Sequence, residues 1–400
     1  MRRDGAKRRF DCSTNHEEQC VRLLCSSGMG GAAGRTATFA ETNGKGRILA
    51  VTKTTPAING EFVRVVTEDG LELNGLYVGP SQNARAKRQK SESAGPDSGP
   101  KPPVPGPFCL VHVHGWDGNF YENRFIDHAA AVCGRLGIGF VSGNNRGHDY
   151  VADVLRSRTS QKAKGKSQKA KPTDRFDYVQ IGGMYEKLAD CVPDIKAWVD
   201  FAVGRGAKRV ILQGHSHGAI KATHYLTTTS DPRVCGLILL SPSDDMGLAR
   251  RQLGERFSWV LSRAREMTSK GSGRKLLSDR DFSYPVSAAT FFDCHNKDSI
   301  TGVFNVSRTD RREFPELASI RVPALVAVGT VEEAFIGKPD KYVEEIRTCM
   351  VNCPSFTGAV VEGAPHNYLG RETQLARLLE KWLKSRTQGV KDSRTREKSW

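Results

Sequence analysis

The stretch that decides the fold of this chain is Arg209-Val-Ile-Leu-Gln-Gly-His-Ser-His-Gly-Ala-Ile-Lys-Ala-Thr-His-Tyr-Leu226. Residues 209–213 are apolar and β-branched, as in a buried strand, and residues 219–226 have spacing compatible with a helix. Between them lies the pattern Gly-X-Ser-X-Gly. A strand, a sharp turn that exposes a serine and a helix form a nucleophile elbow, in which glycines allow close backbone packing. The stretch therefore predicts that Ser216 is a nucleophile at the end of a sheet strand.

The net charge of +16 would suit a nucleic-acid partner, so its location along the chain matters. Four segments together carry +18 and leave about −2 for the rest: residues 1–60, 81–107, 155–175 and 385–400. The basic charge thus belongs to tails and insertions. No helix-turn-helix, zinc-finger or aromatic RNA-binding pattern accompanies it. We therefore expect no dedicated nucleic-acid binding.

No stretch approaches the roughly 20 apolar residues that a membrane span needs. The Arg-rich first ten residues are not followed by the apolar segment of a secretory signal. Four acidic residues up to Glu18 argue against an organelle transit peptide, although organelle targeting stays the alternative to a cytoplasmic location. The ten cysteines show no paired metal-ligand spacing. We expect a cytoplasmic protein without a metal or an organic cofactor. Met29 is a second candidate for the start of translation.

Three segments lack sustained periodicity or are dominated by Pro, Gly, Ser and Lys, and we expect them to be mostly disordered: residues 1–58, 81–107 and 155–175. Residues 386–400 form a basic tail. The sequence therefore places the folded domain within residues 59–385. It opens with a predicted hairpin whose strands flank a turn at Asp69-Gly70.

Predicted strands and helices alternate through the rest of the domain. The predicted strands are residues 109–114, 139–142, 209–213, 235–240 and 322–328 and the region of Val360-Val361. The predicted helices are residues 125–136, 185–203 and 374–383. This alternation indicates an α/β fold with a mostly parallel central sheet and helices on both faces. Residues 245–318 interrupt this alternation of strands and helices and contain at least one amphipathic helix. We expect this segment to form a lid over the site. The alternative is an ordinary helical insertion that packs on the sheet.

Over residues 60–385 the chain resembles the α/β-hydrolase superfamily. The hairpin, the His114-Gly115 turn, the segment Asn144-Asn-Arg-Gly-His-Asp149, the elbow and a late His366 occur in the order typical of that family. More narrowly, residues 114–123, 146–149 and 194–199 look like an esterase-like branch that includes fungal proteins described as siderophore esterases. The resemblance implies an α/β-hydrolase fold and cofactor-free hydrolytic chemistry at Ser216.

A serine hydroxyl is a weak nucleophile and must pass its proton to an adjacent base as it attacks. His366 fits that role, because it follows the last predicted strand and precedes the final helix, which gives the chain order Ser, acid, His. The other histidines lie before or beside the nucleophile, in the helix of the elbow, or within residues 245–318. Ser216 and His366 are therefore the predicted nucleophile and base.

The acid that orients the base is expected in the loop after the strand at residues 322–328. Glu332 stands three residues after a glycine there, where many relatives have Asp, so its side chain is one methylene longer. Its neighbour Glu333 is an alternative. Asp244 and Asp245, which follow the preceding strand, are further candidates for this acid.

An oxyanion hole needs two backbone N–H groups directed at the developing charge. The expected donors are His217, which also lies at a helix N-terminus, and, by the resemblance, Trp116. The side chains of Trp116, Phe120 and Tyr121 are predicted to line the substrate pocket, with core packing as the alternative. His148 and Asp149 are expected to fix their own loop.

These residues predict a serine hydrolase that cleaves a small-molecule carboxylic ester through an acyl-enzyme. An acyltransferase or a peptidase that uses the same acyl-enzyme is the first alternative, since the elbow is common to all three. The second is a hydrolase-like protein that binds a partner without catalysis. A serine at the elbow, in place of a carboxylate, argues against dehalogenase and epoxide-hydrolase chemistry.

Overall fold

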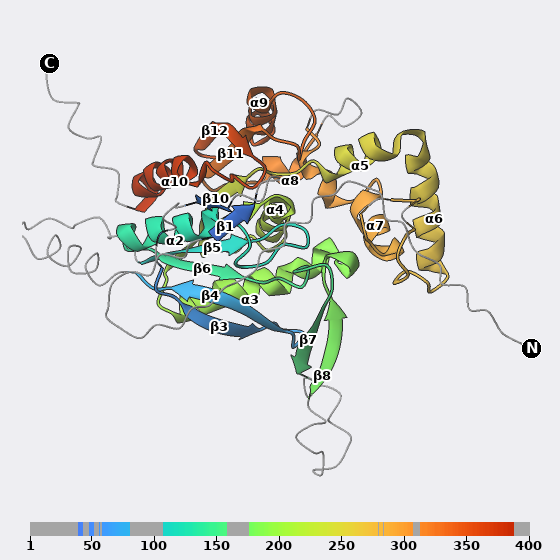
Figure 1. The fold of residues 1–400 in the computed structure, drawn as a ribbon, viewed down its shortest axis with the longest axis horizontal. Coiled ribbons are helices and arrows are strands. Elements are labelled where there is room, and N and C mark those ends of the chain that lie inside the picture. The colour runs from blue at the N-terminus through green and yellow to red at the C-terminus, as the bar shows by residue number, and fades with distance from the viewer. Residues whose placement is uncertain are drawn as a thin grey trace, which may run out of the picture. The chain divides into compact units, whose positions relative to one another are not determined.

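The computed structural model describes residues 39–42, 48–51, 56, 58–80, 107–157, 176–278, 280–282, 284–306 and 313–387 (Figure 1). The chain divides into two compact units, residues 1–55 and 56–400. In the first, β1 (Phe39–Thr42) pairs antiparallel with β2 (Ile48–Val51). This ladder departs from the expectation that residues 1–58 lack regular structure. Strand-forming residues flank Asn43-Gly44, a dipeptide typical of hairpins, and that pattern is the signal for the two strands.

In the described part of the second unit, eight strands form one sheet in the order β12-β11-β10-β9-β5-β6-β4-β3. The strands are β3 (Glu61–Val66), β4 (Glu72–Val78), β5 (Phe108–Val113), β6 (Gly139–Gly143), β9 (Arg209–His215), β10 (Val234–Leu240), β11 (Ala324–Val331) and β12 (Phe356–Pro365). Strand β4 runs antiparallel to its two neighbours, and the other neighbouring pairs are parallel. The mostly parallel sheet is therefore present as predicted.

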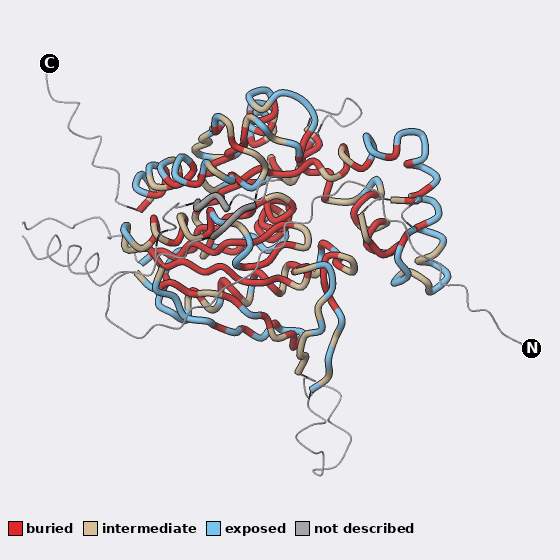
Figure 2. The backbone as a smooth tube through the Cα atoms, viewed as in Figure 1, coloured by how far each residue is buried: buried red, intermediate tan, exposed pale blue. Residues whose placement is uncertain are grey.

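Helices cover both faces of this sheet (Figure 1). One face packs against α2 (Phe125–Leu136) and α10 (Glu372–Thr387). The other packs against α3 (Cys191–Gly204), α4 (His217–Thr229), α8 (Pro315–Ala318) and α9 (Pro339–Cys349). Successive side chains of a strand point to opposite faces, so Leu110 belongs to the hydrophobic cluster on the first face and Val111 to the cluster on the second. The central strands of the sheet are buried along most of their length (Figure 2). Together with the serine elbow after β9, this architecture is the α/β-hydrolase fold, which confirms the predicted fold class.

The helix predicted for residues 185–203 is shorter than expected. Two 3₁₀ turns, η3 (Gly183–Tyr185) and η4 (Leu188–Asp190), precede α3, which begins at Cys191. Pro193 explains this start, because a residue without an N–H group fits only in the first helical turn.

A second small ladder lies beside the sheet, where β7 (Ala152–Ser157) pairs antiparallel with β8 (Phe176–Ile181). Residues 155–157 belong to β7, which corrects the prediction that disorder begins at residue 155. The side chains of Arg156 and Asp177, which stand opposite each other, form an ion pair at 2.8 Å across the ladder. Residues 158–175 and 81–106 lie outside the described residues, as do residues 388–400; α10 extends past the predicted domain end to Thr387.

A helical insertion separates β10 from β11. It contains α5 (Asp245–Leu253), η5 (Gly254–Arg256), α6 (Phe257–Ser269), α7 (Ala288–His295) and η6 (Ile300–Phe304). Its helices bury a hydrophobic cluster of their own, which includes Leu253, Val260 and Phe291. Helices are therefore present where the sequence predicted a lid. The role of a lid stays a prediction. No helix among the described residues is both long enough and apolar enough for a membrane crossing.

Candidate active site

Strand β9 leads directly into Ser216, and α4 begins at the next residue. Ser216 has φ of 58° and ψ of −130°, a backbone conformation that costs a non-glycine residue energy. The close packing explains the flanking glycine, since a Cβ at Gly214 would lie 2.2 Å from the carbonyl oxygen of Gly218. This turn has the geometry of the predicted elbow and presents the serine at the carboxyl end of the sheet.

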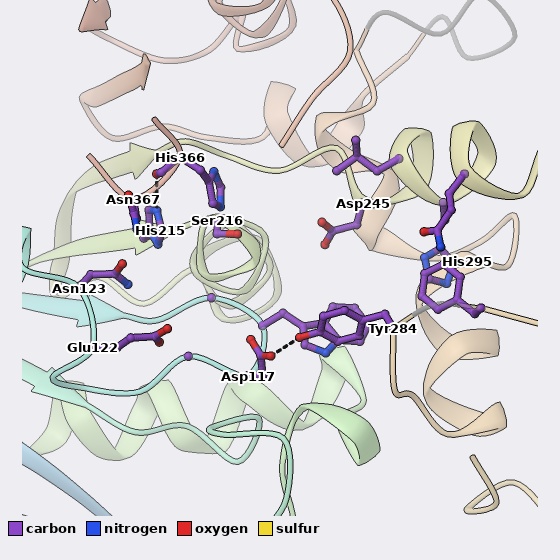
Figure 3. A pocket seen from close by; sticks show the side chains of 17 residues that line it. Asp117, Glu122, Asn123, His215, Ser216, Asp245, Tyr284, His295, His366 and Asn367 are labelled. Atoms are coloured by element: carbon purple, nitrogen blue, oxygen red, sulfur yellow. Dashed lines mark hydrogen bonds between the residues drawn. The ribbon is translucent and has the colours of Figure 1, made fainter. Parts of the chain in front are cut away.

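His366 lies just after β12, and Figure 3 shows its ring directed toward Ser216. The Nδ1 atom of His366 is 2.7 Å from Oε1 of Glu332, which stands at the end of β11. An imidazole that donates Nδ1–H to a carboxylate keeps Nε2 as the acceptor for a serine proton. The structure therefore brings three of the predicted residues, Ser216, His366 and Glu332, into one arrangement.

The Glu332 carboxylate is fully buried, whereas the His366 side chain is 24% exposed. Burial by itself would raise the pKa of Glu332, but the hydrogen bond and the charge of His366 outweigh it and lower this pKa to about 2. The carboxylate is therefore ionised at neutral pH, as an imidazolium partner requires.

The alternative acids make other contacts. Glu333 is exposed and donates its backbone N–H to Glu332. Asp244 caps α5 by accepting the N–H of Gly247 at 2.9 Å. Asp245 accepts a hydrogen bond from Nδ1 of His217, with 2.5 Å between the two atoms. Among the four candidates, Glu332 is the one that contacts His366.

His215, which the sequence analysis did not assign, supports the loop that carries His366. Its Nε2 lies 2.9 Å from the carbonyl oxygen of His366, and the two rings are 4.9 Å apart (Figure 3). Burial lowers the pKa of His215 to about 3, so the ring is neutral and can donate one N–H to that carbonyl. His215, the residue directly before the nucleophile, thus holds the backbone of the predicted base His366 in place.

Gly115 lies directly against the elbow. A Cβ at Gly115 would stand 2.9 Å from Cβ and 3.3 Å from Oγ of Ser216, so only glycine allows this approach. The next residue is Trp116, and His217 is the first residue of α4, where N–H groups have no partner within the helix. Of the two predicted oxyanion donors, His217 therefore directly follows Ser216 in the sequence, and Trp116 directly follows the glycine that packs against Ser216. Their role stays a prediction.

A cavity of about 470 Å³ opens beside Ser216 and His366 (Figure 3). The loop after β5 lines it with Trp116 and Asp117; the helical insertion contributes Asp245, Leu248, Ala249, Gln252, Phe282, Tyr284 and His295. The structure does not support the prediction that Phe120 and Tyr121 line this cavity. Phe120 is buried against Phe62, while Tyr121 is 67% exposed and packs on Phe120.

Carboxylates dominate the charge of the cavity wall, which contains no lysine or arginine among the described lining residues. Asp117 accepts a hydrogen bond from the hydroxyl of Tyr284, yet burial raises its pKa. Burial and the charge of Asp117 also raise the pKa of Glu122. This wall therefore disfavours an additional anion.

The Asn144–Asp149 loop contains the other polar residues of the resemblance. His148 and Asp149 contact each other through Nδ1 and Oδ2 at 2.8 Å, and Asp149 also accepts a hydrogen bond from Asn119. Arg146 pairs with the fully buried Asp194 at 2.7 Å. These contacts fit the expectation that the segment fixes its own loop. No group of three or more His, Cys, Asp or Glu side chains suited to a metal ion occurs among the residues described.

Comparison with known proteins gives one family match. The family described as "serine aminopeptidase, S33" matches residues 165–337. No curated protein matches the chain. The matched segment contains Ser216 and Glu332 and ends before His366.

Solved structures give further similarities. The structure of Est1E from Butyrivibrio proteoclasticus with bound ferulic acid is 17% identical, covers 80% of this chain and 97% of its own, and has a TM-score of 0.49. A monoacylglycerol lipase from Paleococcus ferrophilus is 15% identical, with coverage of 78% and 98% and a TM-score of 0.47. The carboxylesterase CesB from Bacillus subtilis is 17% identical, with coverage of 84% and 94% and a TM-score of 0.42.

Proposed function

We propose that this protein is a serine hydrolase that cleaves a carboxylic ester through an acyl-enzyme. One observation carries the proposal: a strained serine lines the same cavity as His366, whose ring is hydrogen-bonded to Glu332. A nucleophile, a base and a group that orients the base are the parts that such chemistry needs. The cavity volume of about 470 Å³ falls in the usual range for small-molecule sites, which favours a small ester.

In the acylation step, Oγ of Ser216 attacks the ester carbonyl carbon while its proton passes to Nε2 of His366. The carbonyl oxygen becomes an oxyanion, which the N–H groups of Trp116 and His217 stabilise. When the tetrahedral intermediate collapses, the bond to the alkoxy oxygen breaks, and that oxygen takes the proton from His366. The products of this step are an alcohol and an acyl-serine.

In the deacylation step, His366 accepts a proton from a water molecule, whose oxygen attacks the acyl carbon. The second tetrahedral intermediate releases the carboxylic acid, and the proton on His366 returns to Ser216. Throughout both steps Glu332 stays ionised and stabilises the imidazolium, in keeping with its low pKa.

Labelling with a fluorophosphonate tests the proposal, because the reagent phosphonylates an activated serine. We expect the wild-type protein and Ser319→Ala to be labelled, since Ser319 is exposed and does not line the cavity. We expect Ser216→Ala to stay unlabelled. An unlabelled wild-type protein, or a labelled Ser216→Ala, would rule out Ser216 as the nucleophile.

The acidic wall favours a second candidate, a peptidase that removes an amino-terminal residue. Asp117 and Glu122 could hold a substrate ammonium group, and the matched family is described as serine aminopeptidase. Parallel assays with p-nitrophenyl butyrate and an amino-acid p-nitroanilide distinguish the two candidates. A higher kcat/KM for the anilide, lost in Asp117→Asn, would favour the peptidase.

A further inference from the structure

A lysine is buried directly behind the proposed active site. Lys221 lies on α4, five residues after Ser216, and its side chain is 0% exposed, which is rare for lysine. Its Nζ lies 2.7 Å from Oε1 of Glu186, 3.0 Å from Oδ1 of Asn145 and 3.4 Å from the carbonyl oxygen of Gly115. The contact with Glu186 is an ion pair, and the contacts with Asn145 and Gly115 are hydrogen bonds that Nζ donates. Two donated hydrogen bonds and a carboxylate at ion-pair distance require the ammonium form. Lys221 is therefore charged, and one of its contacts is the backbone of the Gly115 turn.

His114 is a second donor to the same carbonyl. The backbone N–H of Asn145 donates to its Nε2 at 3.0 Å, so Nδ1 carries the ring proton and donates to the carbonyl oxygen of Gly115 at 2.9 Å. Burial, followed by the charge of Lys221, holds the pKa of His114 well below its ordinary value. The Gly115 oxygen thus receives hydrogen bonds from a neutral imidazole and an ammonium group.

That carbonyl belongs to the same planar peptide group as the N–H of Trp116. In a trans peptide the C=O and the N–H point in opposite directions, so fixing the oxygen on the side of Lys221 directs the N–H to the other side. A cation at the carbonyl also polarises the group and makes the N–H a stronger donor. Because Gly115 lies against Ser216, this N–H is the one that the proposed mechanism uses for the oxyanion.

We propose that Lys221 is a positioning residue, which together with His114 orients and polarises the Gly115–Trp116 peptide as an oxyanion donor. This inference rests on the proposed hydrolase function and adds a residue to it. Glu186, 3% exposed, supplies the counter-charge that lets the ammonium group lie in the interior. A buried ion pair is a poor source of stability compared with apolar packing, which favours a functional reason for its presence.

The test uses the double variant Lys221→Met/Glu186→Gln in the full chain, because removing both charges leaves neither one buried without a partner. Tyr225→Phe is the matched control, since Tyr225 is buried on the same helix and donates a hydrogen bond to Asp231 away from the site. For each protein we would measure the melting temperature, kcat and KM for p-nitrophenyl butyrate, and the Ki of an aliphatic trifluoromethyl ketone. The adduct of that ketone with a serine carries an oxyanion.

In the double variant we expect kcat to fall roughly tenfold to hundredfold with KM nearly unchanged, because the lost interaction acts on the transition state. The Ki of the ketone should rise by a similar factor, while Tyr225→Phe lowers the melting temperature without changing kcat. A folded double variant with wild-type kcat and Ki would overturn the inference. Failure of fluorophosphonate to label the wild-type protein would instead remove the proposed function, and with it the basis of this inference.

Discussion

Glu332 reaches His366 because its side chain folds back onto its own loop. Its Oε1 accepts the backbone N–H groups of Glu333 and Ala334, both at 3.1 Å, in addition to the bond from His366. Three donors on one oxygen fix the carboxylate. The same hydrogen bonds hold the Glu side chain in its folded-back conformation. A side chain one methylene longer than Asp can therefore still form an ordered pair with His366.

Replacing Glu332 by Gln tests its role as the orienting acid. We expect kcat for p-nitrophenyl butyrate to fall by roughly 10³–10⁴-fold, because a neutral amide cannot stabilise the imidazolium and favours the wrong histidine tautomer. Glu333→Gln removes a carboxylate from the exposed neighbouring side chain and should keep wild-type kcat. If Glu333→Gln caused the larger loss, the assignment of the acid would be wrong.

The low pKa of Glu332 also predicts how stability depends on pH. In the folded protein the pKa is about 2, below the ordinary value of 4.5, so the ionised form stabilises the fold above about pH 4.5. That stabilisation is lost as the pH falls from 4.5 toward 2. The difference in unfolding free energy between wild type and Glu332→Gln, measured by urea denaturation, should be constant from pH 5 to 6 and should shrink below pH 4.5. A difference that grows on acidification would contradict the prediction.

At the scale of elements, one part-buried pair joins the start of the helical insertion to the elbow. Asp245 is the first residue of α5, and its hydrogen bond to His217 joins this helix to the start of α4. The ring of Trp116 packs on His217 at 4.9 Å, so the same histidine also contacts the loop after β5. The start of the insertion, the elbow and that loop therefore meet at His217.

Asp245→Asn should loosen α5 while leaving the sheet intact. A hydrogen bond to a charged group contributes about 1.5–3 kcal/mol, so amide hydrogen exchange in α5 should accelerate roughly tenfold or more. Exchange in α9, on the other side of β11 in the sequence, provides the internal control. Unchanged exchange in α5 would mean that the hydrophobic cluster of the insertion alone holds this helix.

The elements that the sequence predicted well have local signals. The helix at residues 125–136 and the strand at β9 follow from apolar periodicity, and the position of His366 follows from the order of strands. Strands β7 and β8 were not predicted, because they pair with each other outside the main sheet and are flanked by basic residues. Each of these two strands forms by pairing with the other, and the hydrophobic periodicity of one segment does not reveal such a pairing.

The buried contacts of the site were the least predictable part. Lysine is almost always exposed, so nothing in residues 219–226 indicates that Lys221 lies in the interior. Its burial depends on Glu186 and Asn145, which come from distant loops. The choice of Glu332 over Asp244 and Asp245 likewise depends on how β11 and β12 align at their ends. Such residues are determined by tertiary packing, for which a single sequence has no pattern.

At the scale of the molecule, every residue assigned to the site belongs to the unit of residues 56–400. Its sheet lies between two hydrophobic clusters, and both are built from residues after position 62. Among the residues whose burial the structure describes, all buried members of these clusters belong to the second unit.

A chain that begins at Pro56 should fold and react like the full protein. We expect its melting temperature to match that of the full chain within about 2 °C, since it keeps every buried side chain of the two described core clusters, and we expect its Ser216 to react with fluorophosphonate at the same rate. A chain that begins at Gly70 is the matched control. It lacks β3, whose Val63 and Val65 are buried in the core and whose backbone pairs with β4, so it should aggregate or melt well below the full chain. If the Pro56 chain lost its labelling or its cooperative unfolding, the N-terminal unit would have to contribute to the fold or to the site, and residues 56–400 would not be an independent domain.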